Sequence, residues 1–208
     1  MPSPAPPLPR LFESIRLADG ATPLLDYHQA RMDRTRRALF AKSPVIRLKK
    51  VLAELDLPER GLYKVRIEYD RAVLKTEILP YTPKVITSLR TVNADDVRYG
   101  KKFSDRAAIQ ACYAQRGDAD DVLMIQRGHL TDASYANVAL YDGNYWYTPA
   151  YPLLRGTRRA QLLDEGILRA SVIRERDLVH FERIRLINGM LPWGEGMDIG
   201  MERVYRAE

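Results

Sequence analysis

The sequence predicts an α+β fold with a small N-terminal domain and a larger C-terminal domain. The first 80 residues contain one strand pattern, two helix patterns and a hairpin pattern, whereas the remainder alternates short strand and helix patterns. Pro80, Pro83 and Lys84 separate these two regions, so we expect domains over 1–84 and 85–208. With 208 residues, the chain is long enough to bury a sizeable core.

Five elements are expected in the first domain. Alternating apolar residues predict a strand, and Asp26 can cap the helix that follows. Ser43 can cap a second helix, which has apolar residues along one side. In chain order, these elements are a strand over 11–17, helices over 26–40 and 44–56, and the two strands of a hairpin over 62–69 and 72–79.

The second domain is expected to alternate strands with helices. Ser104 can begin its first helix, which ends before Gly117, and Gly166 is a candidate C-terminal cap for a later one. The expected strands lie over 85–92, 122–126, 137–141, 145–147, 167–173 and 183–188, and the expected helices over 104–114, 157–165 and 175–180.

The net charge of +6 and the pI near 9.4 are compatible with three interpretations. A basic protein can bind nucleic acid, can attract small anionic molecules, or can have a basic surface with no partner. The densest cluster, Arg31, Arg34, Arg36 and Arg37, falls in an expected helix, while the other basic residues are spread along the chain. Charge alone therefore does not choose among the three.

Cysteine content and hydropathy exclude several classes of protein. The single cysteine, Cys112, excludes an intrachain disulfide and argues against a cysteine-rich metal site, so no metal is expected. No apolar stretch approaches the length that spans a bilayer, and the proline-rich first ten residues lack the apolar region of a secretory signal. We therefore expect a cytoplasmic protein that does not bind membranes.

Two segments contain side chains suited to covalent or acid–base chemistry. Lys101 and Lys102 precede an expected helix and lie beside an aromatic residue, and a neutral lysine amine can bond to an aldehyde. Asp132 lies among small and polar residues, where a carboxylate could keep a pyridine nitrogen protonated. Taken singly, the segments also fit a solvated lysine pair and a polar loop in which Asp132 binds its own backbone.

A third segment could bind a phosphate. Gly156 and Thr157 open an expected helix, whose first backbone N–H groups point at any anion placed before them. Plain helix initiation explains the same two residues, so this segment supports a phosphate site only in combination with the other two segments.

Together the three segments resemble the class IV aminotransferase family, the fold-type IV pyridoxal-phosphate (PLP) enzymes. This family includes D-amino-acid aminotransferases and aminodeoxychorismate lyase. The resemblance runs from about residue 11 to residue 192 and rests on the order and spacing of its motifs. These motifs are Phe12-Glu13-Ser14-Ile15-Arg16, His28-x-x-Arg31, Gly128-x-x-Thr131-Asp132-x-x-x-x-Asn137, Gly156-Thr157-Arg158-Arg159 and Leu186-Ile187-Asn188-Gly189-Met190.

The resemblance implies a two-domain fold like that of D-amino-acid aminotransferase, with a shortened N-terminal domain. It implies PLP bound between the domains, and a homodimer. Lys102 would bind PLP covalently and then act as general base, and Asp132 would stabilise the protonated ring nitrogen. Asp132 stands where the family generally has Glu, so the loop or the ring must shift to keep the contact. The residues implied at the phosphate or on the substrate side are Arg31, Gly156, Thr157, Arg158, Asn188 and Gly189. By contrast, Arg36 on the same expected helix is expected to be solvated and to have no such role.

The expected activity is that of a PLP-dependent lyase converting 4-amino-4-deoxychorismate to 4-aminobenzoate and pyruvate. The segment from Asn188 to Pro192 is more similar to the lyases than to the aminotransferases, and the positive charge suits a small anionic substrate with an amino group. The main alternative is a class IV aminotransferase acting on branched-chain or D-amino acids. A more distant alternative is a basic nucleic-acid-binding module built on the helix arginines.

Overall fold

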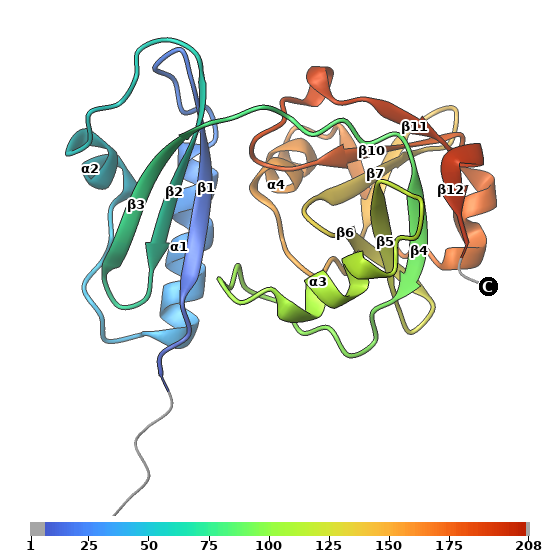
Figure 1. Ribbon diagram of the computed structural model, residues 1–208, viewed down its shortest axis with the longest axis horizontal. Coiled ribbons are helices and arrows are strands. Elements are labelled where there is room, and N and C mark those ends of the chain that lie inside the picture. Colours follow the sequence, from blue (N-terminus) through green and yellow to red (C-terminus); the bar gives the residue numbers. More distant parts are fainter. Residues whose placement is uncertain (1–6, 207–208) are drawn as a thin grey trace, which may run out of the picture. The chain divides into compact units, whose positions relative to one another are not determined.

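The computed structural model describes residues 7–206, which form two compact units (Figure 1). Unit 1 extends to Tyr81 and also includes Lys101–Asp105, and unit 2 consists of Thr82–Gly100 and the chain from Arg106 onwards. Most of the proline-rich N-terminal arm lies outside the described residues. The division into domains at residue 84 stays a prediction.

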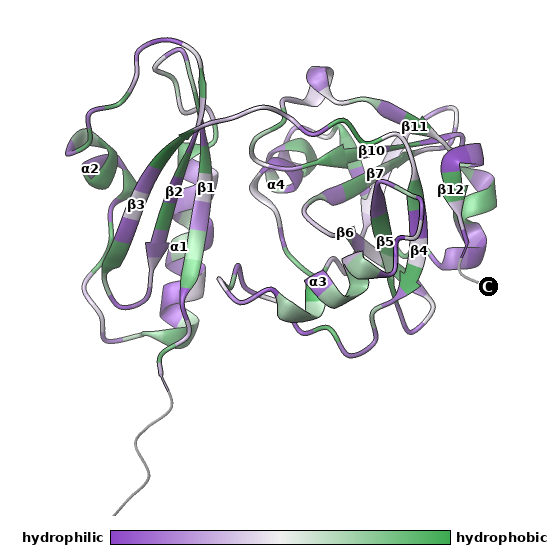
Figure 2. Cartoon of the chain, in the orientation of Figure 1, coloured by the Kyte–Doolittle hydropathy of each residue, from purple (hydrophilic) through white to green (hydrophobic). Residues whose placement is uncertain are grey.

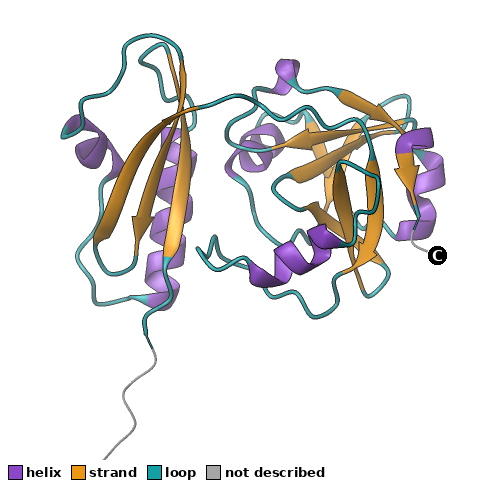
Figure 3. Cartoon of the chain, viewed as in Figure 1, coloured by secondary structure: helices purple, strands orange, loops and turns teal. Residues whose placement is uncertain are grey.

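Unit 1 is a three-stranded antiparallel sheet with two helices (Figures 1 and 3). Its strands, in the spatial order β1-β2-β3, are β1 (Leu11–Ala18), β2 (Leu62–Tyr69) and β3 (Val73–Pro80). The helices are α1 (Leu25–Leu39) and α2 (Leu48–Ala53). The strand and hairpin predictions are confirmed here, because alternating apolar side chains turn one face of this sheet toward the helices.

The core of unit 1 follows that alternation. Leu11, Ile15 and Leu17 of β1 are fully or almost fully buried, and they pack with residues of β2 and of both helices. The second position in the same alternating series, between Leu11 and Ile15, is occupied by Glu13, which is fully buried although it is charged. A buried carboxylate requires hydrogen-bonding or charged partners, and these come from α1.

Both helices of unit 1 differ from their predicted starts. Leu24 is the N-cap of α1, so Asp26 lies in the first turn and does not cap the helix. The second helix begins only at Leu48 and is much shorter than predicted. The side chain of Gln29 donates to the Ile46 carbonyl at 2.9 Å and accepts from the Leu48 N–H at 2.7 Å. These tertiary hydrogen bonds hold the segment before α2 in an extended form.

The segment 101–104 extends along β1 as an additional edge. Phe103 pairs antiparallel with Leu11, and the N–H of Phe12 donates to the Lys102 carbonyl at 3.0 Å. The helix predicted from Ser104 therefore begins later, because Ser104 is bonded to the backbone of Arg10. The helix α3 (Ala107–Ala114) starts after an N-cap at Arg106.

Unit 2 contains two sheets that share one core. The four-stranded sheet has the order β12-β4-β5-β6, and the five-stranded sheet has the order β11-β10-β7-β8-β9. Buried residues of both sheets form one apolar cluster, and Figure 2 shows hydrophobic residues along β5 and β7. The remaining elements are β4 (Leu89–Asn93), β5 (Asp121–Gln126), β6 (His129–Ala133), β7 (Asn137–Tyr141), β8 (Trp146–Pro149), α4 (Thr157–Asp164), β9 (Leu168–Ser171), β10 (Arg183–Ile187), β11 (Asp198–Gly200), β12 (Val204–Tyr205) and the 3-10 turns Glu175–His180, Trp193–Glu195 and Met201–Arg203.

The strand β6 was not predicted from the sequence. It pairs antiparallel with β5 after a turn in which Arg127 and Gly128 both have positive φ angles, 49° and 75°. Two positive φ angles are typical of a tight type I′ hairpin turn. Thr131 and Asp132 are both buried, so the strand lacks the alternation of apolar and polar residues that identifies a half-buried strand.

Candidate active site

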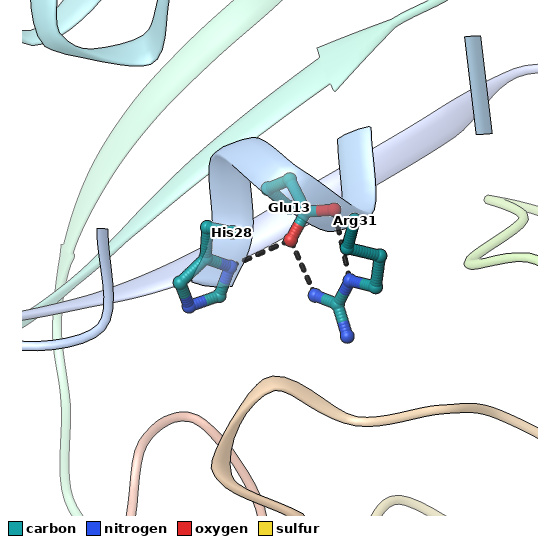
Figure 4. A network of polar contacts seen from close by, with 3 residues as sticks. All are labelled: Glu13, His28 and Arg31. Atoms are coloured by element: carbon teal, nitrogen blue, oxygen red, sulfur yellow. Dashed lines mark hydrogen bonds and ion pairs between the residues drawn. The ribbon is translucent and has the colours of Figure 1, made fainter. Parts of the chain in front are cut away.

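A buried cluster of three polar side chains lies between β1 and α1 of unit 1 (Figure 4). Glu13 Oε2 lies 2.6 Å from His28 Nδ1, and Glu13 Oε1 accepts a hydrogen bond from Arg31 Nε at 3.0 Å. A second nitrogen of Arg31, Nη2, also pairs with Glu13 Oε2. His28 and Arg31 are three residues apart on α1, so both side chains reach the same face of the strand.

The charges of this cluster are unequally distributed. Burial raises the pKa of Glu13, but the charge of Arg31 and the hydrogen bonds from His28 and Arg31 outweigh it and lower the pKa to about 2. Burial lowers the pKa of His28, and the charges of Arg31 and Lys102 act in the same direction, against the contact with Glu13. At neutral pH the cluster therefore contains a carboxylate, a guanidinium and a neutral imidazole.

This ionisation state determines what each side chain can bind. A neutral imidazole that donates from Nδ1 to Glu13 has an acceptor at Nε2, and within residues 7–206 this buried Nε2 has no hydrogen-bond partner. Figure 4 shows the third nitrogen of Arg31 pointing away from Glu13. The predicted phosphate ligand Arg31 is thus a buried cation whose orientation is fixed by a carboxylate.

Lys102 lies in the same unit as this cluster. Its Nζ is 4.6 Å from the centre of the Phe12 ring, and the guanidinium carbon of Arg66 lies 4.0 Å from the same ring. Close by on the same segment, Ser104 donates to Glu68 at 2.6 Å. The structure therefore brings Lys102 near His28 and Arg31, which the sequence separates from it by about 70 residues.

Asp132, the predicted partner of the cofactor ring, is a buried acid in unit 2. Its Oδ1 accepts a hydrogen bond from Asn137 Nδ2 at 2.7 Å, and its Oδ2 accepts one from the Leu154 N–H at 2.8 Å. Burial raises the pKa of Asp132 to about 7, although these hydrogen bonds and the charge of Arg159 oppose the rise. A cation placed against this carboxyl would favour its ionised form.

The start of α4 lies beside Asp132 and Asn137. Gly156 is the N-cap, and a Cβ atom at this position would lie 2.0 Å from Asn137 Oδ1, so only glycine fits. Thr157 and Arg158 follow and are buried, and no side chain within the described part caps the helix. A helix N-terminus without a side-chain cap favours an anionic ligand.

Two further predicted residues lie at the same end of the sheet. Asn188 directly follows Ile187, which is paired with Asn137 across β10 and β7. The Asn188 side chain accepts the N–H of Met190 at 2.8 Å and thereby shapes the turn that contains Gly189. Asn188 thus follows the strand residue that pairs with Asn137, whose side chain contacts Asp132 and lies beside the start of α4.

Sequence reasoning gave no separate role to four residues of these clusters. Glu13, His28 and Asn137 belong to the quoted motifs, but only their contacts reveal what they bind. Arg159 is buried and donates to the Pro149 carbonyl at 2.8 Å, which places its charge near Asp132. A polar residue at a position expected to be apolar, as Glu13 is, was the available sequence signal.

Metal ligation and membrane insertion find no support in the described residues. Between residues 7 and 206, no group of three or more His, Cys, Asp or Glu side chains is arranged to hold a metal ion. None of the helices in that range has the length and apolar character needed to cross a bilayer.

Three comparisons place the chain among known proteins. The model of the family "Amino-transferase class IV" matches residues 10–195. An uncharacterised protein from Haemophilus influenzae is 34% identical over 183 residues, which cover 86% of this chain and 97% of the relative. A solved structure from Haemophilus somnus, provisionally named a 4-amino-4-deoxychorismate lyase, has a TM-score of 0.83 and 33% identity, over 91% of this chain and 98% of that one.

More distant similarities agree with the same fold. The PLP-bound form of a hypothetical aminotransferase from Mycobacterium tuberculosis has a TM-score of 0.73 at 20% identity, and covers 95% of this chain and 86% of that chain. The predicted fold-type IV architecture is therefore confirmed. Because the family model and the Haemophilus relative both cover most of the chain, the protein belongs to the class IV aminotransferase family, whose enzymes depend on PLP.

Proposed function

We propose that the protein is a lyase that converts 4-amino-4-deoxychorismate to 4-aminobenzoate and pyruvate. The observation that carries this proposal is the similarity, at 33% identity over almost the whole of both chains, to the Haemophilus somnus structure provisionally named for this activity. A Schizosaccharomyces pombe protein with a similarly provisional name, 26% identical over 197 residues, supports the same choice.

The side chains of both units fit PLP. Asp132 is a buried carboxyl that a pyridinium nitrogen would ionise, and the N-terminus of α4, which no side chain in the described range caps, offers backbone N–H groups to a phosphate. Within unit 1, Arg31 offers a fixed cation for a phosphate, and Lys102 offers an amine for the aldehyde. When bound, PLP supplies a protonated ring that withdraws electrons from the substrate carbon next to the nitrogen.

The proposal gives each side chain a defined task. Lys102 binds the cofactor aldehyde and later removes the proton from the substrate carbon that bears the amine. Asp132 keeps the ring nitrogen protonated, and Arg31 holds the phosphate. The N–H groups of Gly156, Thr157 and Arg158 complete the phosphate site, while Asn188 and Gly189 contribute on the phosphate or substrate side.

The lyase reaction needs no second substrate. Proton removal by Lys102 is followed by cleavage of the bond between the ring carbon and the enolpyruvyl oxygen, and the six-membered ring becomes aromatic. The departing enolpyruvate takes up a proton and becomes pyruvate, so the two products contain all the atoms of the substrate. A small anionic substrate bearing an amine, a homodimer and a cytoplasmic location belong to the same proposal.

The two alternatives differ in what supports them. Aminotransfer is favoured by the family itself and by the fold shared with a Mesorhizobium loti structure that is provisionally named an amino-acid aminotransferase, with a TM-score of 0.76 at 22% identity. The nucleic-acid module required Arg31, Arg34, Arg36 and Arg37 to form one exposed cluster. The expectation that Arg36 is solvated is wrong, since both Arg31 and Arg36 are buried and bound to other groups.

A substrate test separates lyase from aminotransferase. The purified protein is incubated with aminodeoxychorismate alone, and separately with pairs of amino acid and 2-oxo acid. We expect equal amounts of 4-aminobenzoate and pyruvate in the first reaction, and neither in a Lys102→Ala control. Amino-group exchange in the second reaction without 4-aminobenzoate in the first would assign the chain as an aminotransferase.

A further inference from the structure

We propose that Asn137 is the positioning residue of Asp132 and holds its carboxyl in one orientation against the turn that starts α4. The inference rests on the proposed function in one respect, because it takes Asp132 to be the partner of the cofactor ring. The observations that carry it all lie within unit 2 and concern the contacts of the Asn137 side chain.

Asn137 occupies a rigid place in the fold. It is the first residue of β7, a strand inside the five-stranded sheet, and it is paired with Ile187 of β10. Only three residues separate it from the end of β6, and the N–H of Ala133 bonds to the Ala136 carbonyl at 2.9 Å across this connection. The Asn137 side chain is 5% exposed, so its position is fixed by its backbone and its neighbours.

The donor end of the Asn137 amide binds two acceptors. Nδ2 lies 2.7 Å from Asp132 Oδ1 and 2.7 Å from the Leu154 carbonyl oxygen. A carbonyl oxygen can only accept, so the atom facing it must be the NH₂ nitrogen, which has two N–H groups for these two partners. The N–H of Leu154 donates to Asp132 Oδ2 at 2.8 Å and closes a ring of three hydrogen bonds.

The acceptor end of the same amide is confined as well. A Cβ atom on Gly156 would lie 2.0 Å from Asn137 Oδ1, so the amide oxygen fills the space beside the N-cap of α4. One side chain therefore connects the carboxyl of Asp132, the backbone of Leu154 and the start of the helix. Rotation of the amide would break both hydrogen bonds and press against Gly156.

The arrangement controls the charge of Asp132 as well as its direction. Burial disfavours the carboxylate, and each N–H donor that faces it favours the carboxylate. The groups that face it are the Asn137 amide, the backbone N–H groups of Leu153 and Leu154 and the charge of Arg159. Loss of the Asn137 donor leaves a buried acid that is both less ionised and free to turn.

The test compares Asn137→Leu, which keeps the side-chain size but removes the donor, with Asn144→Leu at an exposed asparagine of a turn. Titration of the Asp132 carboxyl is followed by NMR in the full-length protein with and without PLP, with the signal assigned from its absence in Asp132→Asn. In the cofactor-free protein we expect Asn137→Leu to raise the pKa of Asp132 by about one to two pH units. Asn144→Leu should leave this pKa unchanged.

A second variant covers the case in which Asn137→Leu does not fold. Gly156→Ala leaves Asn137 in place but displaces its amide, and should raise the pKa of Asp132 in the same direction. An unchanged Asp132 titration in the folded variants, or an equal change in Asn144→Leu, overturns the proposal. Normal turnover in Asp132→Asn, together with the expected titration shifts, would instead reject the role of Asp132 at the ring and leave the positioning by Asn137 intact.

Discussion

The backbone of Phe12 donates a hydrogen bond to the Lys102 carbonyl at 3.0 Å, and the Lys102 amine lies 4.6 Å from the centre of the Phe12 ring. The two residues are thus held together through both main chain and side chain, although 89 residues separate them in the sequence. The guanidinium carbon of Arg66 lies 4.0 Å from the same ring centre, so one aromatic side chain contacts two cations.

The first prediction concerns this lysine. Lys102→Ala should lose covalent attachment of PLP while the fold remains intact, because alanine has no amine that can bond to the aldehyde. Lys101→Ala is the matched control and should retain the yellow absorbance of the bound cofactor. Borohydride reduction followed by peptide mapping identifies the modified lysine, and a label on Lys101 would reject the assignment.

The second prediction concerns Asp132. Asp132→Asn should still bind PLP, because the phosphate and aldehyde contacts remain, but an amide cannot keep the ring nitrogen protonated. Turnover should fall roughly 10- to 150-fold, which corresponds to the loss of about 1.5–3 kcal/mol of charge-assisted stabilisation. Steady-state kinetics at saturating PLP measure this fall, and turnover within a few-fold of the parent would contradict the assignment.

The third prediction concerns the phosphate. Arg31→Ala should weaken PLP binding by roughly 10- to 150-fold, since it removes a charge-assisted contact worth about 1.5–3 kcal/mol. Arg34→Ala, at an exposed position of the same helix, is the control and should have little effect. Equilibrium titration of cofactor-free protein gives both affinities, and equal effects would mean that the helix arginines act only through their general charge.

Arg31 also neutralises the buried Glu13, so its removal affects folding as well. A buried carboxylate without its partner costs about 3–5 kcal/mol. The double variant Glu13→Gln with Arg31→Ala should recover much of this stability in denaturant unfolding, but not the PLP affinity. Recovery of both would show that Arg31 acts only by supporting the fold.

The fourth prediction concerns acid stability. The pKa of Glu13 is lowered to about 2 in the folded protein, so Glu13 stabilises the fold above its ordinary pKa of 4.5 and loses this contribution as the pH falls toward 2. The loss amounts to roughly 3 kcal/mol. Between pH 4.5 and 2 the unfolding free energy of Glu13→Gln should therefore fall less steeply than that of the parent. Parallel curves would show that Glu13 does not titrate in this range.

The fifth prediction follows from the correction at Arg36. Its guanidinium donates to the backbone carbonyls of Pro44, Asp70 and Arg71, and so ties α1 to the β2–β3 turn. Arg36→Ala should lower the unfolding free energy by about 1.5–3 kcal/mol, because the three hydrogen bonds of the buried guanidinium are lost. PLP affinity should change little, and Arg37→Ala at an exposed position should affect neither quantity.

Local patterns predicted those parts of the fold that depend on local sequence. The strand β1 and the β2–β3 hairpin alternate apolar and polar residues, and α4 with its terminal Gly166 follows ordinary helix signals. The predictions of secondary structure failed where contacts with residues distant in the sequence determine the local conformation. The hydrogen bonds of Gln29 place the start of α2 later than predicted. The buried polar residues of β6 have the composition of a loop, so this strand was not predicted.

The sequence predicted which residues form the candidate site, but not which of them contact one another. Motif spacing selected Lys102, Asp132 and Arg31, whereas the buried pairing of Glu13 with Arg31 depends on how a helix packs on a strand. Composition could not distinguish the buried Arg36 from the exposed Arg37 one position later. These distinctions arise from tertiary packing, which cannot be inferred from the local patterns of a single sequence.

The pairing of residues 101–104 with β1 has a consequence for biosynthesis and for protein engineering. Unit 1 is completed by a segment that leaves the ribosome only after the first strand of unit 2 has been made. Until then β1 has an open edge, and open strand edges pair readily with other chains. A fragment ending at Tyr81 would keep that open edge and lack the lysine, and an exchange of this unit with a relative must therefore transfer two separate pieces of chain.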